Sequence, residues 1–289
     1  MKPSRFEYEA PASLKEAVAL LEEHGPDAKP LAGGQSLVPL MNLRLAAPRV
    51  LVDLTRIPGV SSIDGSDGHL AIGALTRHRA LAESELVRRR CPLLAQAASL
   101  VGYPSIRARG TIGGSLAHAD PSAELPLAAV TLDAEISLLG PEGSRSVGSS
   151  EFFRGYFTTA LEDSEVLTEV RFPMGDPQDR WAFEEFSRKS GDFAVAAAAV
   201  CLTLTGDVVA RARVGVAGAG DRPVRAPAVE AALEGHSLND TDLAEVADAV
   251  GREVLSDGGG RDILERRQLI AVLVRRALER ARDAGGSPA

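Results

Sequence analysis

Two short stretches decide the fold of this sequence: "LAGGQSL" at residues 31–37 and "TIGGSLAHADPSAE" at residues 111–124. Each combines apolar residues with a glycine pair, a small polar residue and a leucine. A glycine pair lacks Cβ atoms and tolerates positive φ, so the backbone can approach a ligand closely and its N–H groups can converge on an anion. Gln35 and Ser36 add an amide and a hydroxyl beside the first pair. Two such loops favour a ligand with several phosphates, or a long ligand held from two sides; tight turns without a ligand are the alternative.

Other phosphate-binding motifs are absent or incomplete. The sequence contains no GxxxxGK[ST] pattern, which excludes a P-loop nucleotide hydrolase. The nearest approach to a dinucleotide fingerprint is "GVAGAGDRP" at residues 215–223, where Pro223 stands in the third glycine position and the following residues cannot open a helix. We expect a strand end and a turn there.

The composition is that of an ordinary globular protein. The chain has 289 residues, 45% of them hydrophobic and 25% charged, which fits one large domain or two to three smaller ones. A net charge of −8 argues against nucleic-acid binding, and the basic clusters at 88–91 and 275–282 are expected to be solvated helix faces. No apolar run is long enough to span a membrane, and the N-terminus lacks the apolar core of a signal peptide. The sequence predicts a cytoplasmic protein.

The cysteines limit which metal centres the chain could hold. Only Cys91 and Cys201 are present, whereas an iron–sulfur cluster or a structural zinc ion normally requires about four ligands. The histidines are scattered and do not suggest a metal site. Any iron–sulfur chemistry is therefore expected in another chain.

Secondary structure can be assigned from capping signals and apolar runs. Residues 13–25 predict a helix with Ser13 as its N-cap and Gly25 just past its end, followed by a strand–loop–strand unit that contains the first glycine pair. Further on, the sequence predicts strands at 69–75, 134–140 and 165–173 and helices at 76–87, 91–102 and 124–132.

A second part begins after the turn-forming stretch 174–180. Three strands joined by hairpins are predicted at 181–190, 193–206 and 208–218; Val200 and Thr203 favour a strand although the middle run is rich in alanine. The C-terminal residues predict helices at 227–235, 241–254 and 262–284, a glycine loop at 258–260 and a frayed tail. The fold class is α+β.

At this point three longer stretches become recognisable. The sequences "LAGGQSLVPLMNLRLAAPRVLVDL" (31–54), "RARGTIGGSLAHADPSAELPLAA" (107–129) and "SRKSGDFAVAAAAV" (187–200) resemble the FAD-binding medium subunit of molybdenum hydroxylases. That family includes the flavin subunits of carbon monoxide dehydrogenase and quinoline 2-oxidoreductase, with the flavin domain of xanthine dehydrogenase as a more distant relative. The resemblance covers nearly the whole chain in order.

The resemblance implies a fold and a domain organisation. We expect a two-subdomain FAD-binding fold of the vanillyl-alcohol-oxidase (PCMH) type at 1–175, with subdomains at about 1–56 and 57–175. A C-terminal molybdenum-hydroxylase flavoprotein domain with a three-stranded antiparallel sheet and helices is expected at 180–285. FAD would lie between the two N-terminal subdomains with both glycine loops on its pyrophosphate.

The resemblance also implies which residues bind FAD. Family members place an acid near the ribityl or ribose hydroxyls, a backbone position near the adenine, and further residues beside the flavin ring. Carried over residue by residue, the implied FAD-binding residues are Ala32, Gly33, Gly34, Gln35, Ser36, Leu37, Thr76, Thr111, Gly113, Gly114, Ser115, Asp120, Glu124, Leu167, Lys189 and Phe193.

Several of these residues have a purely structural alternative. Glu124 could serve as a first-turn helix acid, Lys189 as a solvated strand residue and Thr76 as a helix N-cap. His118 is expected to form hydrogen bonds in its loop rather than a covalent bond to the flavin. Ser115 replaces an asparagine, and Phe193 a tyrosine, of many relatives; losing that tyrosine hydroxyl could alter flavin tuning or acceptor access.

The implied function divides the chemistry among subunits. A large molybdenum-cofactor subunit would hydroxylate the substrate and a small subunit would carry two [2Fe–2S] clusters, while the FAD of this chain would pass electrons to an external acceptor. No catalytic acid, base or metal ligand is then needed here, and a dimer of heterotrimers is implied. A self-contained flavin oxidase or reductase and a non-catalytic flavin-binding module remain the alternatives.

Overall fold

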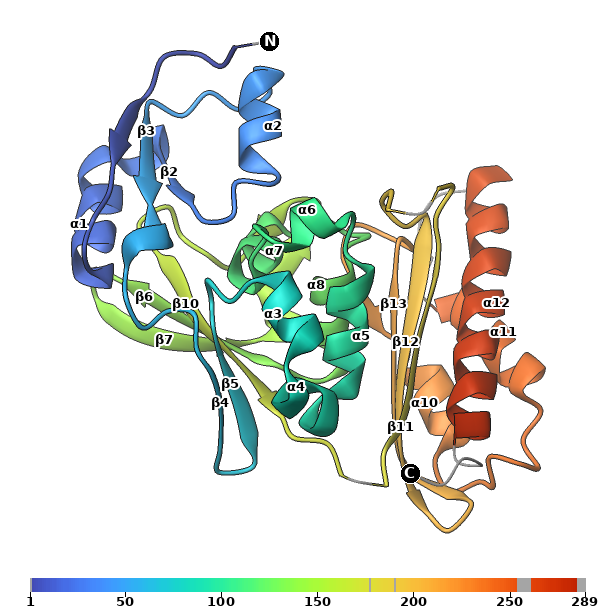
Figure 1. The fold of residues 1–289 in the computed structure, drawn as a ribbon. Coiled ribbons are helices and arrows are strands. Elements are labelled where there is room, and N and C mark those ends of the chain that lie inside the picture. The colour runs from blue at the N-terminus through green and yellow to red at the C-terminus, as the bar shows by residue number, and fades with distance from the viewer. Residues whose placement is uncertain (1, 177, 190, 254–260, 285–289) are drawn as a thin grey trace.

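The fold is that of a computed structural model, which describes residues 2–284 except 177, 190 and 254–260. A small N-terminal sheet lies beside a five-stranded sheet, and a group of helices separates the latter from a C-terminal sheet (Figure 1). Long helices cover the outer side of the C-terminal sheet (Figure 1). This arrangement confirms the predicted α+β class.

The N-terminal unit is a parallel three-stranded sheet with one helix packed on it. Its strands are β1 (Glu7–Glu9), β2 (Ala28–Leu31) and β3 (Val50–Asp53), with β3 in the centre. The helix α1 (Leu14–His24) begins at Ser13, whose hydroxyl accepts the Glu16 N–H at 3.2 Å, and ends at Gly25 with φ of 52°. The predicted helix 13–25 and the strand–loop–strand unit are confirmed.

The second unit is an antiparallel five-stranded sheet in the order β4-β5-β10-β6-β7. Its strands are β4 (Ile63–Ser66), β5 (His69–Gly73), β6 (Glu135–Gly140), β7 (Gly143–Gly148) and β10 (Val166–Pro173). The helices beside it are α3 (His78–Glu83), α4 (Glu85–Arg90), α5 (Pro92–Leu100), α6 (Pro104–Arg107), α7 (Ile112–His118) and α8 (Glu124–Thr131). The strands predicted in this part of the chain are confirmed.

The helix predicted over 76–87 is wrong in detail, because it is two helices. The break lies at Ser84, whose hydroxyl accepts the N–H of Val87 at 3.4 Å and so caps α4. A serine hydroxyl competes with the continuing helix for backbone donors and favours a new N-terminus. The N-cap of α3 is Arg77 rather than Thr76, so the capping role considered for Thr76 is also wrong.

The C-terminal sheet explains the alanine-rich run. Its strands are β11 (Arg180–Phe186), β12 (Ala196–Thr205), β13 (Val208–Ala217) and the short β14 (Val224–Arg225), so the three predicted strands gain a short fourth. Ala198 and Val200 face the outer helices, whereas Ala197 and Ala199 face α5 and α8. Both faces of β12 are therefore buried, and small side chains allow the helices to approach closely.

Helices complete the C-terminal part. They are α10 (Pro227–Leu233), α11 (Leu243–Glu253) and α12 (Arg261–Asp283), as predicted. The predicted glycine loop 258–260 lies outside the described residues, as does all but the first residue of the tail that follows 283. Among the described residues, no helix is both long and apolar enough to cross a membrane.

The largest hydrophobic core crosses the predicted boundary at 174–180. Phe183 and Ala199 of the C-terminal sheet belong to the same buried cluster as Leu94 of α5 and Leu127 of α8. The C-terminal sheet is thus held against the helices of the second unit over a buried, apolar interface, which fixes the loops at its edge relative to the glycine segments.

Several short elements connect the larger ones. They are the 3₁₀ turns Gly25–Asp27 and Leu54–Arg56 and the elements α2 (Leu37–Asn42), α9 (Ser149–Phe152), β8 (Phe153–Gly155) and β9 (Thr158–Thr159). Only the first glycine pair lies in a turn. The second is part of α7, which corrects the prediction of two similar loops.

Candidate functional site

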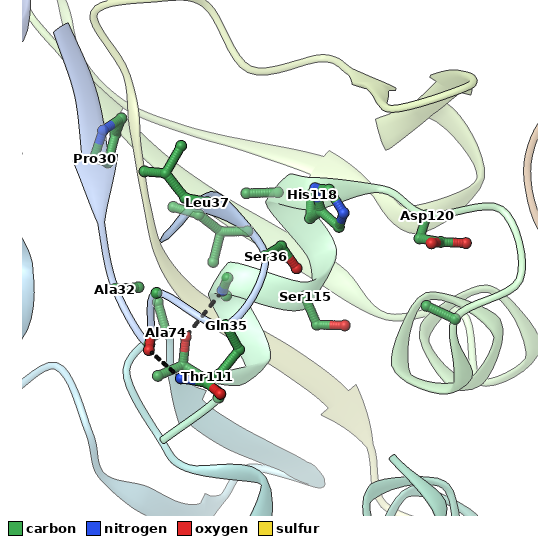
Figure 2. A pocket seen from close by; sticks show the side chains of 18 of the residues that line it. Pro30, Ala32, Gln35, Ser36, Leu37, Ala74, Thr111, Ser115, His118 and Asp120 are labelled. Carbon is green, nitrogen blue, oxygen red and sulfur yellow. Dashed lines mark hydrogen bonds between the residues drawn. The ribbon is translucent and has the colours of Figure 1, made fainter. Parts of the chain in front are cut away.

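Both glycine segments border one cavity of about 570 Å³. The first segment follows β2, and the second opens α7, so two stretches about eighty residues apart in the sequence lie on adjacent walls. Figure 2 shows the side chains of Gln35, Ser36, Ser115, His118 and Asp120 around this space. The cavity is long, because its lining extends from Lys29 on β2 to Phe193 beyond β11.

The first wall offers backbone donors that pair with no acceptor among the described residues. Gly34 adopts φ of 71°, which turns the chain from β2 into α2. No acceptor within the described residues pairs with the backbone N–H groups of residues 33–36, while the Gln35 side chain braces the turn by donating to the Gly33 carbonyl at 3.1 Å. These N–H groups fit the oxygens of a phosphate.

The second wall uses its glycines differently. The Gly113 N–H donates to the Ala74 carbonyl at 2.8 Å, and the Gly114 N–H donates to the Thr111 hydroxyl at 3.1 Å. These two donors are therefore already paired, which corrects the expectation that both glycine pairs present free N–H groups. The physical reason is that the second pair lies in the first turn of a helix, where the N-cap hydroxyl of Thr111 satisfies Gly114 and the Ala74 carbonyl satisfies Gly113.

Close backbone packing explains the glycines of both walls. A Cβ on Gly33 would lie 2.4 Å from the Arg109 carbonyl oxygen, and one on Gly113 would lie 2.6 Å from the Ala74 Cβ. The first contact joins the two walls directly, since Arg109 lies just before the second glycine segment. A side chain at either position would separate segments that together shape the cavity.

Most of the residues implied to bind FAD share this cavity. Those that line it are Ala32, Gly33, Gly34, Gln35, Ser36, Leu37, Thr111, Gly113, Gly114, Ser115, Asp120, Glu124, Leu167 and Phe193. Asp120 accepts the Ser122 N–H at 2.9 Å, so its carboxylate is oriented by its own turn. Phe193 is 70% exposed at the edge of the cavity, on the segment that follows β11.

The structure does not bring Thr76 and Lys189 to the cavity. Thr76 is buried, and its hydroxyl donates to the Ser62 carbonyl at 3.1 Å. Lys189 is exposed in the turn after β11. The structural alternative, a solvated strand residue, is therefore right about exposure and wrong about the strand. Their implied contacts with FAD have no support from the geometry.

Sequence reasoning missed a large share of the lining. The missed residues come from three segments, 29–30, 101–106 and 157–166, that only the tertiary fold brings to the cavity. They are Lys29, Pro30, Val101, Gly102, Ile106, Phe157, Thr158, Leu161, Glu162, Asp163 and Val166. Phe157 has φ of 49° and its ring lies 5.1 Å from that of His118. No local pattern marks these residues, because their positions depend on sheet packing.

Burial shifts the pKa of three lining residues. Burial, and then the charges of Glu185 and Asp120, raise the pKa of Glu124 to about 7, opposed by its own backbone N–H. Burial lowers the pKa of His78 to about 4, so this imidazole is neutral near pH 7. Burial also lowers the pKa of His118, with the Asp120 charge opposing. The interior of the cavity is therefore poor in positive charge.

The described geometry defines a class of protein. A long cavity with unpaired backbone donors on one wall and closely packed glycines between its walls suits an extended phosphate-bearing cofactor. Among the described residues, no group of three side chains could hold a metal ion, and both cysteines are buried and unpaired. The class is that of proteins that bind an extended, phosphate-bearing cofactor in a long cavity.

Comparisons with known proteins give the family. Residues 4–175 match the family described as "FAD binding domain in molybdopterin dehydrogenase", and residues 181–281 match the "CO dehydrogenase flavoprotein C-terminal domain". The chain belongs to the family of FAD-binding medium subunits of molybdenum hydroxylases. In that family the molybdenum and iron–sulfur cofactors lie in other subunits.

Individual relatives span the whole chain. The 6-hydroxypseudooxynicotine dehydrogenase complex subunit alpha of Paenarthrobacter nicotinovorans is 40% identical over 97% of this chain and 96% of its own. The structure of carbon monoxide dehydrogenase from Hydrogenophaga pseudoflava aligns with a TM-score of 0.93 at 40% identity, covering 97% and 98% of the two chains. Quinoline 2-oxidoreductase from Pseudomonas putida 86 aligns with a TM-score of 0.92 at 34% identity, covering 99% and 100%.

The Thr111 cap gives a first prediction. Replacing Thr111 with valine removes the hydroxyl that accepts the Gly114 N–H, and we expect the free energy of unfolding to fall by about 1–2 kcal/mol. Urea unfolding followed by circular dichroism measures this change. A Thr111→Ser variant keeps the hydroxyl and should recover most of the loss; equal losses in the two variants would show that the methyl group matters and the cap does not.

Proposed function

We propose that this chain is the electron-transfer subunit of a molybdenum-containing hydroxylase or dehydrogenase. In this proposal, electrons from the [2Fe–2S] clusters of a partner subunit reach FAD in the cavity and leave to an external acceptor. The observation that carries it is the first wall, where unpaired N–H groups of residues 33–36 face a cavity that a Cβ at Gly33 would distort. The family membership supports FAD as the ligand.

Particular residues would hold the cofactor. The N–H groups of residues 33–36 would bind the diphosphate, and the packed second wall would fix its position. Ser115, Asp120 and Glu124 would meet hydroxyl groups, the Leu167 backbone the adenine, and Phe193 the flavin ring, as the resemblance implies. Bound FAD would supply the redox chemistry, and the chain's own part would be to bind it, orient it and limit its contact with water.

Partners and substrate follow from the same proposal. The chain would assemble with a large molybdopterin-binding subunit and a small iron–sulfur subunit as a dimer of heterotrimers. Its FAD-binding domain would end at about residue 175 and its C-terminal domain would begin at about residue 180. The relatives named above are associated with 6-hydroxypseudooxynicotine, carbon monoxide and quinoline, so similar medium subunits serve different substrates. We therefore assign substrate choice to the large subunit. Two unpaired thiols are consistent with the proposed cytoplasmic location.

Purification of a tagged chain from its native host tests the proposal. We expect a large subunit and an iron–sulfur subunit to copurify, with flavin and cluster absorbance. After reduction with dithionite, a flavin-free complex carrying Gly113→Ala should be reoxidised by a quinone acceptor at least about tenfold more slowly than the parent complex. Equal reoxidation rates would show that electrons do not leave through FAD.

A second outcome would favour an alternative function. Steady turnover of a small molecule by the lone chain would point to a self-contained flavin oxidase or reductase. Flavin binding by a chain that copurifies with no partner and shows no turnover would point to a non-catalytic module. Neighbouring genes for a molybdopterin-binding chain and an iron–sulfur chain would instead agree with the subunit proposal.

A further inference from the structure

The cavity has an unexpected charge balance for a site that binds a diphosphate. Its described lining contains several carboxyl groups: Asp120, Glu124, Glu162, Asp163, Glu165 and Asp192. Lys29 is the only lysine or arginine in that described lining, and its Nζ lies 3.2 Å from the Asp163 carboxylate. A dianionic ligand therefore enters a site without a free cation, where nearby negative charges oppose its binding.

Glu124 differs from the other carboxyl groups of the lining. It is 8% exposed, and no hydrogen bond from another described side chain reaches its carboxyl group. By contrast, Glu165 is paired with Arg145 at 2.6 Å, and Glu162 is exposed to water, which screens its charge. Glu124 is thus a buried carboxyl group that faces the cavity without a counter-charge.

A second carboxyl group approaches Glu124 from the C-terminal sheet. Glu184 on β11 pairs with Arg280 on α12, so the next residue, Glu185, points to the opposite face, toward α5 and α8. One carboxyl oxygen of Glu185 is buried without a hydrogen-bond partner. Burial raises the pKa of Glu185 as well, and its charge is among the causes that raise the pKa of Glu124.

The other elements packed on α8 bring no compensating charge to Glu124. α5 and β12 contain no charged residue, and α7 contributes only His118, whose pKa is lowered. Arg211 and Arg225 bind Asp133, beyond the far end of α8. The remaining charged residues on packed elements are Arg213, which is paired with Asp179, and the exposed Glu151.

We infer that the cavity takes up a proton at Glu124 when it binds its anionic cofactor, so that the charge of this side chain and the binding of FAD are linked. The inference rests on the proposed function, because it requires FAD in this cavity. Negative charge on the bound diphosphate disfavours the carboxylate form of Glu124, and protonation removes the repulsion. No other co-reactant is needed, since the proton comes from solvent and returns there when FAD leaves.

The direction of the pH dependence follows from this linkage. Well below pH 7 Glu124 is largely protonated already, so FAD binding changes little with pH there. Above pH 7 the free site must gain a proton on binding, and the dissociation constant is expected to rise toward a limit of about tenfold per pH unit. Low pH therefore favours retention of FAD and high pH favours its release.

Fluorescence titration of FAD into the deflavinated complex, between pH 6 and 8, tests the inference. The parent complex should lose affinity above pH 7. Glu124→Gln should bind FAD with little pH dependence and, at pH 8, up to about tenfold more tightly than the parent. A Glu162→Gln control should keep the parental slope, because that side chain is exposed.

Two further variants and one spectroscopic measurement separate the proton site from its neighbours. Glu185→Gln removes a like charge near Glu124, so the rise of the FAD dissociation constant with pH should persist but begin at lower pH. His118→Asn should leave that rise above pH 7 as it is in the parent. Infrared difference spectra on FAD addition at pH 8 should show a new protonated carboxyl band that Glu124→Gln lacks. A parental slope in Glu124→Gln, or its loss in Glu185→Gln, would overturn the inference.

The outcomes also distinguish this inference from the proposed function. FAD binding with no pH dependence in the parent complex would overturn the proton linkage and leave the electron-transfer proposal intact. No FAD binding at any pH, by the complex or by the full chain, would overturn the proposed function and the inference together.

Discussion

Replacing Gly33 with alanine is expected to abolish FAD binding, with a dissociation constant at least about a hundredfold higher than that of the parent chain. The added Cβ would lie 2.4 Å from the Arg109 carbonyl oxygen and 2.8 Å from the Gly110 Cα, both backbone atoms that cannot rotate away. The two walls must then separate, and the turn that carries the unpaired N–H groups of residues 33–36 moves with them. Flavin content after purification and fluorescence titration with FAD measure the effect.

Gly148→Ala is the matched control for this prediction. Gly148 lies in the second unit, and only the Ser150 hydroxyl oxygen, at 3.9 Å, would lie near an added Cβ. Its φ of −64° suits any residue, so the control should bind FAD as the parent does. Circular dichroism should show the same secondary structure in all three proteins. Stoichiometric FAD in Gly33→Ala would contradict the assignment of the cavity.

Replacing Arg213 with methionine is expected to lower the free energy of unfolding by about 3–5 kcal/mol. Arg213 lies on β13 with only 7% of its side chain exposed, 3.7 Å from the Asp179 carboxylate, whose side chain is 8% exposed. Asp179 also accepts the Thr203 hydroxyl at 2.6 Å, so the pair ties the segment before β11 to the C-terminal sheet. Without the guanidinium, the Asp179 charge stays buried and unpaired. Equilibrium urea unfolding measures the loss.

Two variants show whether the buried charge is the cause. Arg280→Met removes a partly exposed partner of Glu184, and we expect a loss below about 1 kcal/mol because water screens that pair. Combining Arg213→Met with Asp179→Leu removes both buried charges and should recover much of the stability. If the double variant is as unstable as Arg213→Met alone, lost packing rather than the unpaired charge explains the effect.

Much of the fold could be predicted because its signals are local. Ser13 and Gly25 mark both ends of α1 within the helix itself, and capping depends only on neighbouring residues. The alanine-rich run was harder, since alanine favours helices in isolation. Val200 and Thr203 indicated a strand, and the structure explains the alanines by the helix layers on both faces of β12.

Two wrong predictions, the unbroken helix over 76–87 and the matching roles of the two glycine pairs, have different causes. The break at Ser84 was visible in principle, because serine favours an N-cap, but the apolar pattern on both sides continued the helical period. The different roles of the two glycine pairs could not be read from their similar sequences. They depend on Ala74, a residue outside both motifs, whose carbonyl occupies the Gly113 N–H.

The sequence by itself determined most of the longer strands and helices, the glycine segments and, through resemblance, the family with its FAD. These properties follow from short-range capping, periodicity and motif spacing. Only the tertiary structure decided which backbone N–H groups are free and which distant segments complete the cavity. It also brings Glu124 of α8 and Glu185 of β11 close enough for their charges to interact. The physical reason is that burial, charge coupling and hydrogen-bond partners arise between residues far apart in the chain, where no local pattern records them.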